Sequence, residues 1–220
     1  MMKTRAGNAI IVHSKSNKEI SAIRGAVVYA EKKNKELYKT SPPNYRIVVC
    51  DSEKDYLKET RYKRIGGCAC VKWGKIIMLK PSLQKGLRAK NTLYHELNHI
   101  FFYHKIRQFK PIWYVEGVGL LNQSYYKPQN KWKKYLRSIP RVQQYLATRA
   151  KRYKKEADEG SFYILSYFCI KYLERRYGAN ELITFIGHIP RPYKNGAFWK
   201  EFNRQFKLTK KELVAGALQK

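Results

Sequence analysis

Residues 95–99 read His95-Glu96-Leu97-Asn98-His99, an H-E-x-x-H segment near the middle of a 220-residue chain. Four residues advance an α-helix by about 400°, so on a helix His95 and His99 lie one turn apart on the same face. Two neutral imidazoles at this spacing are typical ligands of a single zinc ion. Glu96 lies beside that face, where a carboxylate takes a proton from water rather than binding the metal. The segment therefore predicts a helical zinc site with Glu96 as its general base.

The sequence around this segment predicts a long helix that follows a sheet. From about residue 83 to residue 105 there is no internal proline, and apolar residues recur at helical spacing. Ser16 and Glu19 have the spacing of a capping box before an earlier amphipathic helix that ends at the prolines of 41–44. The segments that we expect to form strands are 9–13, 45–50, 68–73 and 75–79. The last two, separated around Gly74, are two strands or one bent ribbon.

The second half of the chain is predicted to be helical throughout. Helices are expected at about 113–123, 131–155 with an interruption at Pro140, 162–177, 180–186, and twice near the C-terminus. Gly178 has a typical C-terminal cap position, and Thr209 and Glu212 repeat the capping-box spacing. We therefore expect an α+β fold and a single domain, 1–220. An α/β lobe, 1–110, carries the H-E-x-x-H helix, and a helical lobe, 111–220, follows it.

Composition indicates a globular protein in a reducing compartment. The chain is 44% hydrophobic and 14% aromatic, which a disordered chain would not be. Its four cysteines are too few and too irregularly spaced for a secreted disulfide framework, and Cys68 and Cys70 lack the second cysteine pair of a zinc motif. No run approaches the roughly 18 apolar residues of a membrane span, and 9–12 is too short for a signal peptide. We expect a cytoplasmic protein, and the sequence does not indicate its oligomeric state.

Carboxylates are almost absent from the middle of the chain. Between residues 60 and 155 the acidic residues are Glu96 and Glu116, whereas the same 96 residues contain 23 lysines or arginines. A catalytic zinc site needs a third protein ligand and one open position. Glu116 lies among apolar residues on the helix expected after Pro111, where a solvated charge fits badly. The distribution of acids therefore predicts Glu116 as the third ligand.

The segment H-E-L-N-H is followed, after 16 intervening residues, by Glu116 within Trp-Tyr-Val-Glu-Gly. This pattern resembles the gluzincin metallopeptidases. It is most similar to the peptidase MA-like group, which is related to thermolysin and the zinc aminopeptidases. The order of the predicted strands and helices ahead of the motif is also similar. The resemblance implies a gluzincin-like zincin fold with its active cleft between the two lobes. It implies Zn²⁺ held by His95, His99 and Glu116, and peptide-bond hydrolysis by water that Glu96 deprotonates.

The segment 163–178 resembles the family helix that carries a tyrosine ahead of a leucine and a closing glycine. Counting back from Leu173 places Tyr163 at the position of that tyrosine. The resemblance implies that the phenol of Tyr163 donates a hydrogen bond to the oxyanion of the tetrahedral intermediate. Tyr167, one helical turn further along, is the alternative residue for this role.

Three features separate this chain from better-known zinc peptidases. The spacer from His99 to Glu116 is shorter than in most gluzincins, and Gly119 lies within the ligand helix. A metzincin would carry a third histidine where this chain has Lys105, and His104 is one position too early. No Gly-Ala-Met-Glu-Asn segment, and no carboxylate at all between residues 60 and 95, is present to hold the free amine of a substrate. Endopeptidase activity is therefore favoured over aminopeptidase activity.

The segment 127–155, from Lys127 to Lys155, contains 11 lysines or arginines and no acid. Its aromatic residues are Trp132, Tyr135, Tyr145 and Tyr153. Cations that neutralise phosphates and rings that stack on bases make a nucleic-acid surface, but a solvated basic helix has the same composition. With a formal net charge of +30, acidic peptide or protein substrates are also candidate partners. The rival hypothesis is a nucleic-acid-binding protein on a zincin scaffold, with peptidase activity lost or secondary.

Overall fold

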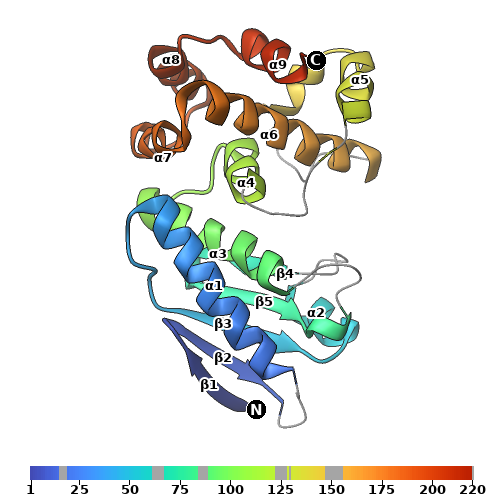
Figure 1. Ribbon diagram of the computed structural model, residues 1–220, viewed down its shortest axis with the longest axis vertical. Helices are drawn as coiled ribbons and strands as arrows, with labels where there is room; N and C mark the ends of the chain where they lie inside the picture. Colours follow the sequence, from blue (N-terminus) through green and yellow to red (C-terminus); the bar gives the residue numbers. More distant parts are fainter. Residues whose placement is uncertain are drawn as a thin grey trace. The chain divides into compact units, whose positions relative to one another are not determined.

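The computed structural model describes residues 1–14, 19–60, 67–83, 89–121, 128, 130–146 and 156–219 (Figure 1). The chain divides into two compact units, Met1–His104 and Lys105–Lys220, which are described separately. The described residues of the first unit contain a mixed sheet with helices, and those of the second are helical. The α+β class is therefore confirmed. That both units belong to a single metallopeptidase domain stays a prediction.

The first unit is built on a five-stranded sheet of order β1-β2-β3-β5-β4. Its strands are β1 (Met2–Ala6), β2 (Ala9–His13), β3 (Tyr45–Cys50), β4 (Gly67–Cys70) and β5 (Lys75–Leu79). β2, β3 and β5 run parallel, and the edge strands β1 and β4 pair antiparallel with their neighbours. Three predicted strands are confirmed as β2, β3 and β5. β1 was not predicted, because its sequence Met-Lys-Thr-Arg-Ala lacks an apolar run.

The strand predicted at 68–73 is wrong in its second half. β4 ends at Cys70, and residues 71–73 form the 3₁₀ turn η1 (Val71–Trp73). Gly74 closes this turn with a φ of 54°, a left-handed conformation that glycine adopts without steric cost. The chain can then return as β5, which pairs with β4 from Cys70 and Lys75 onward.

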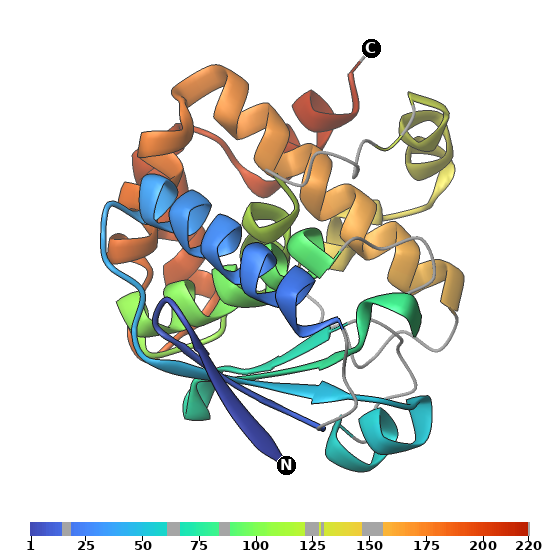
Figure 2. The ribbon, with the colours of Figure 1, turned by 60° about the horizontal axis from the view of Figure 1, so that its bottom comes forward.

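Helices cover both faces of the sheet in the first unit. These helices are α1 (Ile20–Tyr38), α2 (Glu53–Thr60), the 3₁₀ turn η2 (Pro81–Leu83) and α3 (Ala89–Ile106). α1 and α3 lie side by side on one face (Figure 2), where the rings of Tyr38 and Phe101 stack at 5.4 Å. On the opposite face, Tyr56 of α2 packs against Val48 and Ile77. α2 was not predicted, and the predicted start of α3 at 83–88 and Ser16 of the predicted capping box lie outside the described residues.

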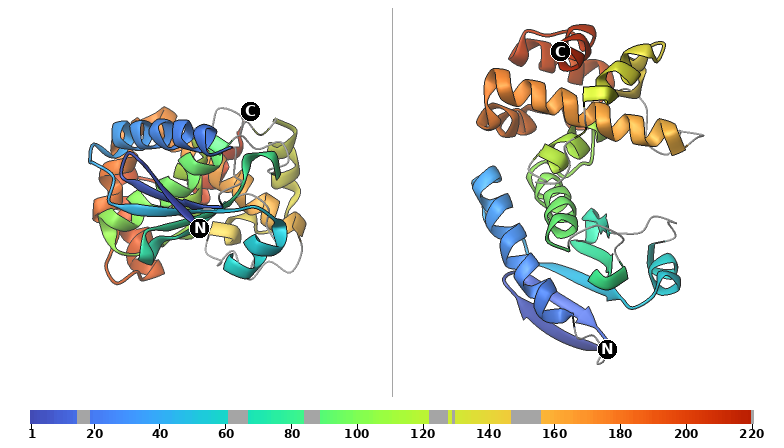
Figure 3. Two further views of the ribbon diagram at one scale, coloured as in Figure 1. Left: turned by 90° about the horizontal axis from the view of Figure 1, so that it is seen from below. Right: turned by 45° about the vertical axis from the view of Figure 1, so that its right-hand side comes forward.

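The described part of the second unit is helical, as predicted. Its helices are α4 (Ile112–Leu121), α5 (Asn130–Ser138), η3 (Val142–Leu146), α6 (Glu156–Tyr177), α7 (Ala179–His188), α8 (Asn195–Phe206) and α9 (Lys210–Leu218). The helix predicted at 131–155 is α-helical only over 130–138 and 3₁₀ over 142–146, and its residues 147–155 lie outside the described residues. α6 is the long central helix, with α4 packed on one side and α9 on another (Figure 3). Gly178 ends α6 with a φ of 86°, and the Thr209–Glu212 capping box is present at α9.

Aromatic side chains fill the core between α4, α7 and α8. Trp113 is 1% exposed and stacks on Trp199, with ring centroids 5.9 Å apart and planes 6° from parallel. The other rings of this cluster are Tyr114, Phe185, Phe198, Phe202 and Phe206. Rings of this size bury much apolar surface, so they fix the start of α4 within the second unit.

Among the described residues, every helix falls short of the length and apolar character that crossing a lipid bilayer requires.

Candidate metal centre

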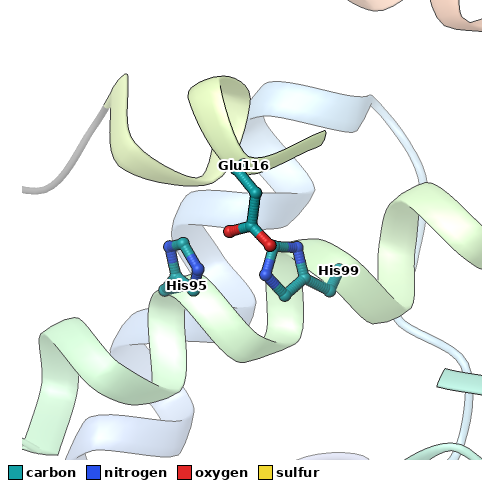
Figure 4. Close-up of side chains that lie close together, drawn as sticks. All are labelled: His95, His99 and Glu116. Carbon is teal, nitrogen blue, oxygen red and sulfur yellow. The ribbon is translucent and has the colours of Figure 1, made fainter. Parts of the chain in front are cut away.

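The two histidines of the H-E-x-x-H segment lie one turn apart on α3, as the spacing predicted. His95 is half-buried and His99 is 5% exposed. Their ring centroids are 4.4 Å apart, and the ring planes meet at 78° (Figure 4). α3 therefore presents two imidazoles from one face at the separation that a shared ion needs.

The carboxylate of Glu116 comes from α4, whose residues from Trp113 to Leu121 are all buried. Glu116 itself is 7% exposed, so it is not a solvated charge on a helix surface. Burying a carboxylate is costly unless a cation or hydrogen-bond donors stabilise it. The residues three and four positions away on α4 are Ile112, Trp113, Gly119 and Leu120, none of which carries a charge.

His95, His99 and Glu116 are brought together as a group with metal-binding potential. Each offers one ligand atom, and these atoms all lie within 4.8 Å of one another. A tetrahedral zinc ion about 2.1 Å from each ligand places the ligand atoms about 3.4 Å apart, so small side-chain rotations suffice. Two imidazoles, a carboxylate and a fourth open position are the donor set of a catalytic zinc site. The residues present therefore fit zinc.

Glu96 is 9% exposed and is not a member of this three-residue group. Its side chain packs against Gly67, the first residue of the edge strand β4. A Cβ atom added at Gly67 would lie 2.9 Å from Cγ and 3.2 Å from Oε1 of Glu96, and 2.6 Å from Cγ2 of Thr92. These separations are closer than ordinary carbon contacts, so glycine at position 67 leaves the room that the Glu96 side chain occupies.

A buried amide network ties α3 to α1 beside the motif. Asn98, a variable position of the H-E-x-x-H segment, is fully buried and donates from Nδ2 to Oδ1 of Asn34 at 3.1 Å. Tyr38 donates its hydroxyl hydrogen to Oδ1 of Asn98 at 3.1 Å. Asn34 in turn donates to the backbone oxygens of Ala30 and Tyr94. Because these buried polar groups are hydrogen-bonded to one another, they fix the position of α3 relative to α1.

Both candidate oxyanion tyrosines lie on α6 and are half-buried. The ring of Tyr163 packs edge-on against Phe162 at 5.4 Å, and that of Tyr167 against Phe168 at 5.7 Å. α4 crosses α6 next to Glu116, because a Cβ atom at Gly117 would lie 2.6 Å from the backbone oxygen of Ser166. Ser166 is three residues from Tyr163 and one from Tyr167, so the choice between the two tyrosines stays open.

Other candidate ligands do not join a metal-binding group among the described residues. His104 is exposed on α3, and the four cysteines form no disulfide. Cys68 and Cys70 pack beside the apolar cluster under α2, which agrees with a structural role. Sequence reasoning missed Gly67 and Asn34, because each acts through a contact with a distant part of the chain. Asn98 lies within the motif, but an asparagine at that position does not by itself predict a buried hydrogen-bond network.

No protein-family model and no curated protein matches this chain.

Proposed function

We propose that this protein is a zinc-dependent peptidase of the gluzincin type, in which His95, His99 and Glu116 hold the metal. The observation that carries this proposal is the convergence of three ligand atoms within 4.8 Å. Two of them come from one helical turn of α3, and the third is one of two carboxylates in a stretch of 96 residues. Two imidazoles and a carboxylate are the protein ligands of many catalytic zinc sites, and they leave a fourth position for water.

The residues around the site have distinct roles in this proposal. Bound zinc supplies Lewis acidity, which polarises a carbonyl and makes water more acidic. Glu96, next to the ligand histidine but outside the ligand group, accepts the proton of the attacking water and returns it to the leaving amine. The phenol of Tyr163, or of Tyr167, donates a hydrogen bond to the oxyanion as negative charge develops there.

The substrate class that we propose is an internal peptide bond of a protein or peptide. The described residues between 60 and 95 provide no carboxylate to bind a free amino terminus. The excess of positive charge favours acidic substrates, since a field of one sign concentrates oppositely charged partners. Cleavage of an internally quenched peptide with blocked termini distinguishes an endopeptidase from an aminopeptidase, because an aminopeptidase leaves such a peptide intact.

The direct test is zinc content and proteolysis in the same preparation. Wild-type protein is expected to hold about one zinc per chain and to cleave unfolded protein, and a chelator should abolish cleavage until zinc is restored. Glu116→Gln should weaken zinc binding by at least about 100-fold, because loss of an outer-sphere partner already costs about 10 to 100-fold. Glu181→Gln, an exposed carboxylate on α7, is the matched control and should bind zinc as wild type does.

Two results would contradict the proposal in different ways. Unchanged zinc affinity in Glu116→Gln would remove this residue from the ligand set. Stoichiometric zinc with no cleavage of any unfolded protein would favour the rival hypothesis, a zincin scaffold without peptidase activity.

A further inference from the structure

α5 presents two aromatic rings to solvent within a basic helix. Trp132 is 37% exposed and Tyr135 is 43% exposed, while Leu136, one helical turn after Trp132, is fully buried. The two ring centroids are 5.8 Å apart and the planes meet at 83°. An edge-to-face contact covers one face of only one of the two rings, so the remaining ring faces are left uncovered by it.

The cations of α5 divide into an outward and an inward set. Lys131, Lys134 and Arg137 are exposed. Lys133 is directed into the second unit, where its Nζ donates to the backbone oxygen of Gln219 at 2.6 Å and lies 5.5 Å from the ring centroid of Phe168. Burial lowers the pKa of Lys133, and the nearby charges of Arg175 and Arg137 lower it further. Lys133 is therefore a structural cation, although its position in the sequence suggests a surface charge.

The exposed residues of α5 form one continuous surface. Successive residues of a helix are about 100° apart, so Leu136 and Lys133 define one side of α5. Lys131, Lys134 and Tyr135 are directed away from that side, and Trp132 and Arg137 lie on its two flanks. We call these five exposed residues the α5 surface. The described part of the segment 127–155 has no carboxylate, so no neighbour in the sequence neutralises these cations.

We propose that the α5 surface binds single-stranded nucleic acid, with Trp132 and Tyr135 stacking on bases and Lys131, Lys134 and Arg137 contacting phosphates. This combination of a cationic track and stacking rings is what sequence-tolerant binding of single strands requires. The site is independent of the metal centre and of the peptidase proposal, since it uses no residue of either.

Two other anionic partners explain the α5 surface less well. An anionic membrane would attract the cations, but membrane insertion needs an apolar face, and the apolar residue Leu136 is already buried in the protein. An acidic protein would also be attracted, but its carboxylates gain little from the two exposed rings. The nucleotides of a single strand, by contrast, present the π-face of a base to each ring and a phosphate to each neighbouring cation.

The experiment measures binding of the full-length protein to a labelled oligothymidylate over a range of salt concentrations. Replacing Lys131, Lys134 and Arg137 together with Gln should lower the slope of log affinity against log salt by about 2, at about 0.7 per phosphate contact. Trp132→Ala should weaken binding about tenfold at each salt concentration and leave the slope unchanged, because stacking releases no counterions. Since both changes are on exposed side chains, thermal unfolding should stay as in wild type.

Three matched controls make the proposal falsifiable. The first replaces Lys194, Lys200 and Lys211 with Gln, which removes the same charge from exposed positions of the second unit and should leave the slope unchanged. The second is Lys133→Gln, which should lower thermal stability and leave the slope unchanged. The third compares oligothymidylate with polyglutamate and with phosphatidylcholine vesicles containing phosphatidylserine.

The proposal is overturned if the control triple variant lowers the slope as much as the α5 triple variant does, because binding would then reflect total charge. It is also overturned if Trp132→Ala binds oligothymidylate as wild type does, or if polyglutamate or the vesicles bind as tightly and lose affinity in the same variants. Absence of oligothymidylate binding at low salt has the same consequence. We expect all of these variants to keep wild-type peptidase activity. Failure of the nucleic-acid proposal would therefore leave the zinc proposal standing.

Discussion

The carboxylates of α3 and α4 differ from those of α8 and α9 in how deeply they are buried and in where their partners lie. On α8 and α9 the acidic side chains interact with residues close to them in the sequence. Glu201 pairs with Arg204 at 2.6 Å, and Glu212 accepts a hydrogen bond from the backbone nitrogen of Thr209 at 2.7 Å. On α3 and α4, Glu96 and Glu116 are 9% and 7% exposed. They lie among mostly apolar neighbours of their own helices.

From this difference we expect Glu201 and Glu212 to contribute to local stability, whereas we propose functional roles for Glu96 and Glu116. The ion pair with Arg204 lowers the pKa of Glu201, and a partner three residues away on an accessible helix is typical of a local, weak contribution to stability. Glu116 instead groups with the imidazoles of His95 and His99, and these three residues could hold a metal ion. Changes on α3 and α4 should therefore affect chemistry, and matched changes on α8 and α9 should not.

The largest contrast is expected between Glu96→Gln and Glu201→Gln. If Glu96 is the general base, as proposed, its replacement should lower turnover by about 10² to 10⁴-fold while zinc content and thermal unfolding stay as in wild type. Glu201→Gln should leave turnover unchanged, since its carboxylate interacts with Arg204 on the same helix. Steady-state cleavage of a quenched peptide, with zinc measured in each preparation, is the readout. Wild-type turnover in Glu96→Gln would remove Glu96 from the mechanism.

The next contrast concerns stability and pairs Asn98→Ala with Asn203→Ala. Without Asn98, the hydroxyl of Tyr38 and the amide oxygen of Asn34 lose their buried partner, which should cost about 2–4 kcal/mol of unfolding free energy. Asn203 is exposed on α8, so its replacement should change stability by less than about 0.5 kcal/mol. Urea unfolding measures both. A double-mutant cycle with Tyr38→Phe should show coupling, and additive effects would mean that the network does not act as a unit.

A smaller effect on turnover is expected from Gly67→Ala, with Gly196→Ala as its control. A methyl group at position 67 displaces the Glu96 side chain and should lower turnover about tenfold, whereas nothing lies within 4 Å of a Cβ at Gly196. Adding Thr92→Ser removes the methyl group at 2.6 Å but leaves the contact with Glu96. Stability should then recover while turnover stays low. Recovery of both together would show that Gly67 matters for packing and not for positioning Glu96.

The smallest expected effect is the pH dependence of Glu212 at the start of α9. Hydrogen bonds from the backbone and side chain of Thr209 lower the pKa of Glu212 below its usual value of 4.5. A carboxyl group with a lowered folded-state pKa stabilises the protein fully above its unfolded pKa and loses this contribution as pH falls through the folded value. Thermal unfolding of wild type and Glu212→Gln should therefore differ at neutral pH and converge as pH falls below the folded-state pKa of Glu212. A difference that persists at low pH would assign the effect to something other than the carboxylate charge.

The sequence predicted those parts of the molecule that are marked by a regular apolar pattern or by a residue type that is scarce around them. β2 and β3 were predicted at their observed bounds because each is a continuous apolar run between turn residues. His95 and His99 were predicted from helical spacing, and Glu116 from the scarcity of other acids. α2 was missed because eight mostly polar residues bury only Tyr56 and Thr60 and show no long periodicity.

The remaining parts depend on contacts between residues that are distant in the sequence. Asn34 and Asn98 are 64 positions apart, and the approach of Gly67 to Glu96 joins an edge strand to a helix. A single sequence contains no record of such pairs. The start of one helix was also misplaced: α6 begins at Glu156, not near Phe162, because charged residues in its first turn hid the start.

The stacked pair Trp113 and Trp199 gives the second unit a built-in optical reporter. The chain has four tryptophans, and Trp73 of the first unit is 80% exposed, so its emission is already that of an indole in water. Trp113 is 1% exposed, within a cluster of rings, and should emit at shorter wavelength until that cluster opens. A red shift of tryptophan fluorescence during denaturation therefore follows the helical unit, while the sheet unit has to be followed by another signal. Any difference between the two curves would show that the units unfold separately.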